Sequence, residues 1–161
     1  MDNTKQVDLV SLERRTELVD SLLLWAGASV EEGSDIVGTV RDDGDTRFGI
    51  RLRTHCKEFM MFWVAVGERF TSFETFLMPY PQKNEVLVLQ YLLRRNYEMT
   101  YLHSAQHRDE ALYLVGRAKT SDMSSELLDT YLGAALAATE ELFPTAMALG
   151  FGSSYRYRPV K

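Results

Sequence analysis

The sequence predicts a single α+β domain, in which one antiparallel sheet of five strands packs against three helices in the order α-β-β-β-α-β-β-α. A chain of 161 residues fits one domain. Its hydrophobic and charged fractions, 45% and 25%, are those of a globular protein. Helical and alternating hydrophobic patterns also follow one another without a repeat or linker. The predicted domain covers residues 1–161, with loose ends at 1–7 and 153–161.

The first predicted element is a helix from about Asp8 to Ala28. Its apolar residues recur every three or four positions and therefore form one stripe, with Asp8 as the N-cap and Gly27 as the stop. The stretch 29–46 that follows is acidic and rich in glycine, which predicts a solvent-exposed loop. Within it, Asp35–Val40 is expected to form no more than a short extended piece.

Three strands are predicted next. Arg47–Thr54 alternates apolar and polar residues, as a strand with one wet face does. Phe59–Val66 and Phe70–Met78 are rich in β-branched and aromatic residues. The dipeptide Gly67-Glu68 between them predicts a tight turn, and hence a β-hairpin.

The middle of the chain predicts a helix and two further strands. Asn84 is placed to cap a helix that runs to Arg95 and is apolar nearly all round, so we expect this helix to be buried on several sides. The segments Thr100–His107 and Ala111–Arg117 alternate as strands, and a polar turn joins them.

The last predicted element is a long helix that begins after the N-cap Ser124 and ends at Gly150. Pro144 lies inside it. Because proline has no N–H to donate to the preceding turn, we expect it to bend or break the helix.

Composition argues against several classes of partner. A net charge of −5 does not favour a broad electrostatic grip on nucleic acid. The longest near-apolar stretches are nine residues each, Leu22–Val30 and Phe59–Gly67, and a membrane span needs about 20. The single cysteine, Cys56, permits no intramolecular disulfide, and no secretory signal opens the chain. We therefore expect a cytoplasmic protein without a nucleic-acid or membrane partner.

Catalytic and metal-binding motifs are not found in the sequence. It contains no G-x-S-x-G elbow, no P-loop and no G-x-G-x-x-G. His103 and His107 have a chelating spacing for a helix, but in a strand they would lie about 13 Å apart, too far for one metal ion. We expect no enzyme activity, no metal site and no cofactor.

The segment Phe59–Val66 is apolar on both of its faces, whereas an antiparallel strand with one wet face should alternate. If the three helices cover one face of the sheet, the other face remains apolar and exposed, as protein-binding surfaces are. In the alternative, one helix crosses this second face and closes the core. We expect the exposed patch and its charged rim to be formed by Phe62, Val64 and Tyr113, with Arg51 and Arg53.

Four segments, in this order and at these separations, resemble the YbjN domain family in its actinobacterial style. The resemblance covers about Arg47 to Phe151. Leu127 departs from it, because an acidic residue is common there, and the acidic stretch 29–46 matches poorly. The segments are Tyr91-Leu92-Leu93-Arg94-Arg95-Asn96, Leu112-Tyr113-Leu114-Val115-Gly116-Arg117, Glu126-Leu127-Leu128-Asp129 followed by Leu132-Gly133, and Leu149-Gly150-Phe151.

The resemblance implies a fold like that of the type III secretion chaperones, which are small acidic dimers that bind an extended segment of a client protein. The family is also labelled a regulator of sensory transduction, and it supplies no catalytic residues. Together with the two-sided strand, this predicts a chaperone-like or regulatory module that acts as a homodimer through an apolar sheet face and holds an unidentified protein client. The alternative is a regulatory domain that senses a small molecule in an apolar pocket beneath Trp63, Phe73 and Tyr91.

Overall fold

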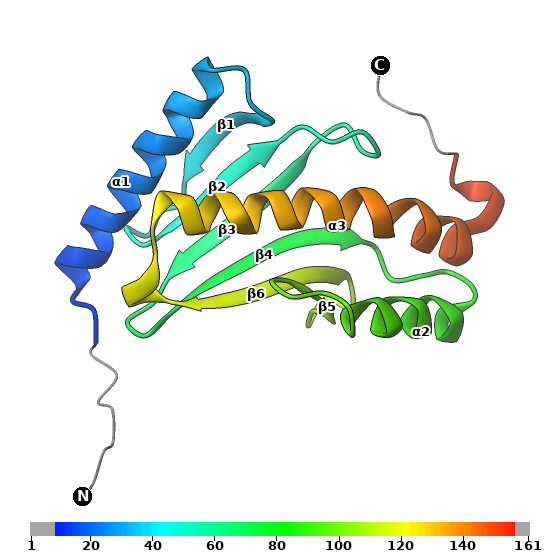
Figure 1. Cartoon of the computed structure of the whole chain (residues 1–161). Helices are drawn as coiled ribbons and strands as arrows, with labels where there is room; N and C mark the ends of the chain where they lie inside the picture. Colours follow the sequence, from blue (N-terminus) through cyan, green and yellow to red (C-terminus); the bar gives the residue numbers. More distant parts are fainter. Residues whose placement is uncertain (1–8, 157–161) are drawn as a thin grey trace, which may run out of the picture.

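Three helices lie on one face of a six-stranded antiparallel sheet in the computed structural model, which describes residues 9–156 (Figure 1). The strands are arranged in the order β1-β2-β3-β4-β6-β5. The helices are α1 (Leu12–Glu31), α2 (Glu85–Asn96) and α3 (Ser125–Phe151). The strands are β1 (Ile36–Arg41), β2 (Arg47–Leu52), β3 (Met60–Val66), β4 (Phe70–Met78), β5 (His103–Gln106) and β6 (Leu112–Lys119).

The sheet has one strand more than the sequence predicted, and the element order is therefore α-β-β-β-β-α-β-β-α. The additional strand is β1, which forms within the predicted acidic loop 29–46 and pairs with β2. Ile36 is buried at its start, opposite Leu52, whereas its last three residues are exposed. An edge strand with one buried end carries too weak an alternation to be distinguished from a loop.

The first helix begins and ends later than predicted. Its N-cap is Ser11, whose hydroxyl accepts a hydrogen bond from the Arg14 N–H at 3.3 Å, and the predicted cap Asp8 lies outside the described residues. The helix continues through Gly27 to Glu31. Gly33, with φ of +75°, follows it and allows the chain to turn into β1.

The long helix α3 begins where the sequence predicts, because the Ser124 hydroxyl accepts a hydrogen bond from the Leu127 N–H at 3.1 Å. It continues as one helix through Pro144, so the predicted break does not occur. It ends at Phe151, one residue after the predicted stop, and Gly152 follows with φ of +55°.

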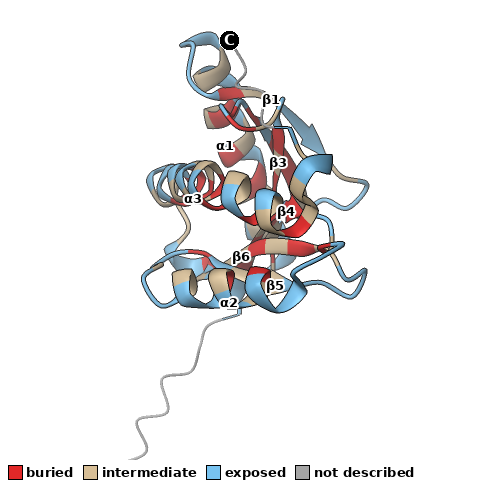
Figure 2. Ribbon diagram, turned by 90° about the vertical axis from the view of Figure 1, so that its right-hand side faces the viewer, coloured by how far each residue is buried: buried red, intermediate tan, exposed pale blue. Residues whose placement is uncertain are grey.

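Pairing between strands decides which side chains meet the helices. Ile50 pairs with Phe62, and Val64 pairs with Phe48 and with Phe73. All five side chains belong to one buried core, and the buried parts of β3 and β4 lie alongside the helices (Figure 2). α1 packs on β1 and β2, and α3 packs on β4. The hairpin predicted between β3 and β4 forms, with a hydrogen bond of 3.1 Å from the Gly67 N–H to the Phe70 carbonyl.

The middle helix α2 is much more exposed than its apolar sequence predicted. It packs against α3 and the edge strand β5 (Figure 1), and only Val88 and Leu92 are buried. Val86, Leu87 and Leu93 remain more than half exposed. The prediction that this helix is buried on several sides is wrong, because α3 already occupies the centre of the sheet.

The chain ends were predicted to be loose at 1–7 and 153–161. Residues 1–7 and 157–161 lie outside the described residues. Between them and the helix, Gly152–Ser154 forms a short 3-10 helix, and the Tyr155 ring meets the Phe143 ring edge to face at 5.7 Å. The beginning of the second predicted loose end is therefore ordered.

Candidate functional site

One face of the sheet carries no helix within residues 9–156, and we call it the bare face. Most of its large apolar side chains come from β3, β4 and β6, and its Arg and Lys side chains come from β2 and β6. By strand register the bare face consists of Gly38, Val40, Arg47, Gly49, Arg51, Met61, Trp63, Ala65, Phe70, Ser72, Glu74, Phe76, His103, Ala105, Tyr113, Val115, Arg117 and Lys119.

Two of the predicted patch residues lie on the wrong side of the sheet. Phe62 and Val64 are fully buried beneath the helices, and their neighbours Met61 and Trp63 face the other way and are partly exposed. Because β3 is apolar on both sides, alternation alone could not tell which set the helices would cover. The register with Phe48 and Ile50, which are both buried, decides it.

The other predicted site residues are exposed to different degrees. Arg51 is exposed on the bare face, and Tyr113 is half-buried there. Arg53 is exposed as well, but it lies beyond the end of β2, where its N–H donates to the Asp35 carbonyl at 2.8 Å. Arg51 and Tyr113 therefore belong to one surface, and Arg53 lies outside the ladder that forms it.

An apolar pocket of about 440 Å³ opens beside Trp63. It lies where β3 begins and β4 ends, and the second half of α3 closes one side of it. Its volume falls in the range of known ligand pockets, about 300–1,000 Å³. The pocket is lined by Lys57, Phe59, Met60, Met61, Trp63, Phe76, Pro79, Tyr113, Phe143 and Met147.

Arginines cover two of the aromatic rings at this end of the bare face. The Arg51 guanidinium lies 3.9 Å from the centre of the Phe59 ring, and that of Arg47 lies 4.1 Å from the Trp63 ring. Arg47 also pairs with Asp42 and, at 3.5 Å, with Glu74. Among the described residues Arg51 has no ion pair, so its hydrogen-bond donors remain free for another group.

Glycine in β2 lets the tryptophan ring lie close to the sheet. A Cβ atom at Gly49 would come within 2.8 Å of the Met61 Cε and 3.1 Å of the Trp63 ring. Since a larger side chain would displace both, Gly49 shapes the floor next to the pocket.

Lys57 is the one basic side chain in the pocket wall, and sequence reasoning did not single it out. Its Nζ donates to the Phe76 carbonyl at 3.0 Å and to the Leu77 carbonyl at 2.7 Å. It also lies 4.5 Å from the centre of the Phe143 ring. Burial away from water lowers the pKa of this amine from 10.5 to about 8. No pattern in the sequence distinguishes Lys57 from an ordinary loop lysine, because its partners come from β4 and α3.

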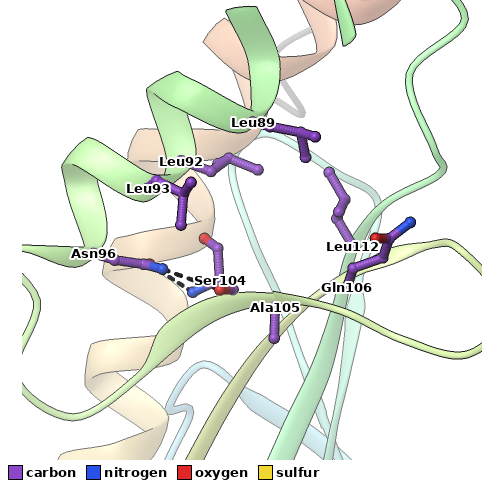
Figure 3. A pocket seen from close by; sticks show the side chains of 8 residues that line it. All are labelled: Leu89, Leu92, Leu93, Asn96, Ser104, Ala105, Gln106 and Leu112. Carbon is purple, nitrogen blue, oxygen red and sulfur yellow. Dashed lines mark hydrogen bonds between the residues drawn. The ribbon is translucent and has the colours of Figure 1, made fainter. Parts of the chain in front are cut away.

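A smaller groove of about 250 Å³ runs between α2 and the edge strand β5 (Figure 3). Across it, the Asn96 side chain accepts a hydrogen bond from the Ser104 N–H at 2.7 Å and donates one to the Ser104 carbonyl at 3.0 Å. The amide therefore occupies outward-facing backbone groups of β5, which hinders another strand from pairing there.

The pocket predicted beneath Trp63, Phe73 and Tyr91 does not form. Trp63 points to the bare face, and Phe73 is buried in the core on the other side of the sheet. Tyr91 lies on α2, which packs against α3 and β5. Of the three residues, only Trp63 lines the 440 Å³ pocket.

Side chains that could bind a metal ion together are not clustered in the part of the chain that the structure describes. No group of three or more His, Cys, Asp or Glu side chains between residues 9 and 156 is placed to hold a metal ion. Cys56 is buried, and this burial raises its pKa. Over the same residues, no helix has the length and apolar character needed to span a bilayer.

Relatives of this chain occur among mycobacteria. It is 32% identical over 91 residues to an uncharacterized protein of Mycobacterium leprae (strain TN), and 31% identical over 91 residues to one of Mycobacterium tuberculosis (strain ATCC 25618 / H37Rv). Each match covers 56% of this chain and 50% of the relative. The chain thus spans about half the length of the curated relatives it matches.

Two solved complexes contain chains with the same fold. A chain of the HopA1-SchA chaperone-effector complex superposes with a TM-score of 0.59 at 11% identity, covering 84% of this chain and 98% of that one. A chain of the ExsC-ExsE complex superposes with a TM-score of 0.58 at 14% identity, covering 89% and 100%. At such low sequence identity, the similarity establishes a shared fold and nothing more.

A family model matches residues 18–147, and therefore also the acidic stretch that the sequence resemblance left out. Its description is "YbjN: Putative bacterial sensory transduction regulator". The chain belongs to the YbjN family and has the α+β fold of the type III secretion chaperones.

Proposed function

We propose that this protein is a non-enzymatic, chaperone-like module that holds a segment of another protein on the bare face of its sheet. The observation that carries the proposal is the exposed apolar surface around Trp63, Met61 and Phe76, next to a pocket large enough for a side chain. The shared fold adds support, since one of the similar structures is a chaperone-effector complex.

The test is a selection of peptides displayed on phage against the purified protein, repeated with two variants. Trp63→Asp places a charge on the bare face, and Leu24→Glu places one at an exposed leucine of α1, on the helix side of the sheet. We expect the selected peptides to bind the wild type and the Leu24→Glu variant and to lose affinity for Trp63→Asp. Peptides that bind all three proteins equally would contradict the proposal.

We propose further that the protein binds a second copy of itself. The sequence suggested that this homodimer uses the sheet face, but two bare faces brought together would place Arg51, Arg117 and Lys119 of each copy against like charges. The outer side of α2 suits a second copy better. It exposes Val86, Leu87 and Leu93, which can meet the same residues of a symmetry mate.

Light scattering tests the dimer. We expect a mass of twice 18.4 kDa for the wild type and for Leu24→Glu, and a monomer for Leu93→Glu. A wild type that stays monomeric at high concentration would remove the dimer from the proposal and leave the partner-holding surface in place.

A second candidate function is the sensing of a small molecule, favoured by the 440 Å³ pocket beside Trp63. A ligand that binds only the native state raises the free energy of unfolding by RT ln(1 + L/Kd), where L is the free ligand concentration, and therefore raises the melting temperature. A thermal-shift screen of metabolites with Trp63→Asp as the control separates the two functions. A shift that grows with the concentration of one metabolite and that the variant lacks supports sensing, and the absence of any shift counts against it.

A further inference from the structure

The basic and acidic side chains of this protein are distributed unevenly between its surfaces. The chain as a whole carries a net charge of −5. On the bare face, however, the strands carry four Arg or Lys residues and one acidic residue, Glu74. The four basic residues are Arg47, Arg51, Arg117 and Lys119. An acidic protein therefore presents a basic surface where its exposed apolar side chains also lie.

The carboxylates near this face already have partners. Asp42 and Glu74 both contact Arg47 of the face itself, and Asp109, at the turn before β6, contacts the His107 ring at 3.1 Å. Within residues 9–156, Arg51, Arg117 and Lys119 have no ion pair. The face thus has surplus positive charge available to a partner.

The pocket contains a cation that lacks a counter-ion. Lys57 gives two of its three N–H groups to backbone carbonyls, at 3.0 and 2.7 Å. None of the described carboxylates lies within salt-bridge distance of it, and it is enclosed by the rings of Phe76 and Phe143. A carboxylate that enters the pocket mouth would accept the third N–H and supply the missing charge.

We propose that the bare face selects an extended peptide that is both apolar and acidic, with an apolar side chain in the Trp63 pocket and carboxylates against Lys57 and Arg51. This inference rests on the proposed function and names the chemistry of the partner. The Arg51 guanidinium stacks on the Phe59 ring, which restricts its orientation. Its N–H groups can therefore donate two parallel hydrogen bonds to one carboxylate.

Single-stranded nucleic acid also combines negative charge with flat apolar groups, but the rings of this face are poorly placed to stack on bases. Arg47 covers Trp63, and Arg51 covers Phe59. Phe76 and Tyr113 are engaged with each other edge to face at 5.6 Å. Stacking platforms require free ring faces, so an acidic peptide is the better occupant.

The experiment uses the full chain with Trp25→Phe, so that Trp63 is the only tryptophan and its fluorescence reports on the bare face. Three dodecapeptides are titrated: one alternates Glu with Phe and Leu, the second has Lys in place of Glu, and the third keeps Glu but has Ala in place of Phe and Leu. We expect the first peptide to bind at least about tenfold more tightly than either of the others. Its affinity should decrease as salt is added.

Two charge variants locate the binding. Arg51→Glu should weaken binding of the Glu peptide about tenfold or more, and it should strengthen binding of the Lys peptide. Arg14→Glu, at an exposed position of α1, should leave both peptides unchanged. Thermal melting of each variant shows that it is folded.

Three results would overturn the inference. If the Lys peptide binds as tightly as the Glu peptide and Trp63 responds to both, the face holds peptides without regard to charge, and the proposed function stands without this refinement. If oligothymidylate binds more tightly than any peptide, the partner is nucleic acid. If no peptide changes Trp63 fluorescence, both the inference and the partner-holding function fall.

Discussion

Single residues carry the chemistry that distinguishes this sheet from an ordinary packing surface. Lys57 donates hydrogen bonds to the Phe76 and Leu77 carbonyls, at the point where the pairing of β4 with β6 is irregular. In doing so it places an ammonium group among aromatic rings. A charged amine in such surroundings is less well solvated than in water, and its protonation should therefore affect folding.

The first prediction concerns the pH dependence of stability that Lys57 causes. Because burial lowers its pKa from 10.5 to about 8, the unfolded chain binds the extra proton between these two pH values. The free energy of unfolding should therefore rise with pH across this window. Below about pH 8, Lys57 contributes a constant penalty.

Urea denaturation of the wild type and Lys57→Met at pH 7 and pH 9.5 checks this. The wild type should gain roughly 1–2 kcal/mol relative to the variant over this range, allowing for the partial exposure of the amine. Lys119→Met, at an exposed lysine, controls for the loss of a charge. A difference between wild type and Lys57→Met that stays constant with pH would contradict the prediction.

A second prediction concerns two glycines with opposite roles. A Cβ atom at Gly116 would lie 2.6 Å from the Tyr101 carbonyl oxygen and 2.8 Å from a Leu102 methyl group. Gly116→Ala should therefore destabilise the protein by about 1–3 kcal/mol. Gly133, exposed in α3, has open space around it, and Gly133→Ala should stabilise the protein by about 0.5–1 kcal/mol. Thermal melting measures both, and equal effects of the same sign would be inconsistent with the close approach at Gly116.

At the scale of elements, β3 separates the folding role of the protein from its proposed binding role. Its four even-numbered residues are buried beneath the helices, and Met61, Trp63 and Ala65 are only partly buried on the bare face. One strand thus supplies apolar side chains to the core and to the surface at alternate positions. Neighbouring substitutions in this strand should have different consequences.

The third prediction compares two adjacent aromatic residues of β3. Phe62 is fully buried and stacks on Phe73 with 5.7 Å between ring centres, so Phe62→Ala should cost about 3–5 kcal/mol of stability. Trp63→Ala should cost clearly less, because the ring is partly exposed, yet it should abolish the binding of selected peptides. Denaturation and fluorescence-anisotropy titration measure the two effects. Comparable losses of stability would mean that the bare face belongs to the core.

At the scale of the whole molecule, the sheet is supported unevenly. β3 and β4 each have a strand on both sides and a covered face, whereas β1 and β5 are edges. Within the described residues, α3 is the helix that packs on β4, and α2 reaches the sheet through the short strand β5 (Figure 1). Local opening should therefore begin at the edges and at α2, next to the surfaces that the proposed function uses.

Native-state hydrogen exchange provides the fourth prediction. Amides of β3 and β4 should exchange last, with a free energy close to that of global unfolding, and those of β1, β5 and α2 should exchange through smaller openings. An excess of a selected peptide should slow exchange along β2 and β3 more than along α2. If the amides of α2 and β5 exchange together with those of β3, the molecule opens as one unit, which would contradict the prediction that the edges open first.

Much of the fold could be predicted from short-range patterns. Both the β3–β4 hairpin and the Ser124 cap were predicted correctly, because turn and cap chemistry depend on a few adjacent residues, although the hairpin turns at Glu68-Arg69, one residue after the predicted dipeptide. β1 was missed because its alternation is weak, and α2 was wrongly buried because an apolar helix does not reveal what it packs against. Lys57 could not be identified, since its acceptors lie in β4, about twenty residues away.

The amino-acid sequence by itself determined the kinds of element, the family resemblance and the fact that β3 is apolar on both sides. These properties depend on residue type and local periodicity. Only the tertiary structure decided that the helices cover Phe62 and Val64 and leave Trp63 outside. That choice depends on strand register and on where α1 and α3 pack, which are set by contacts between residues far apart in the chain.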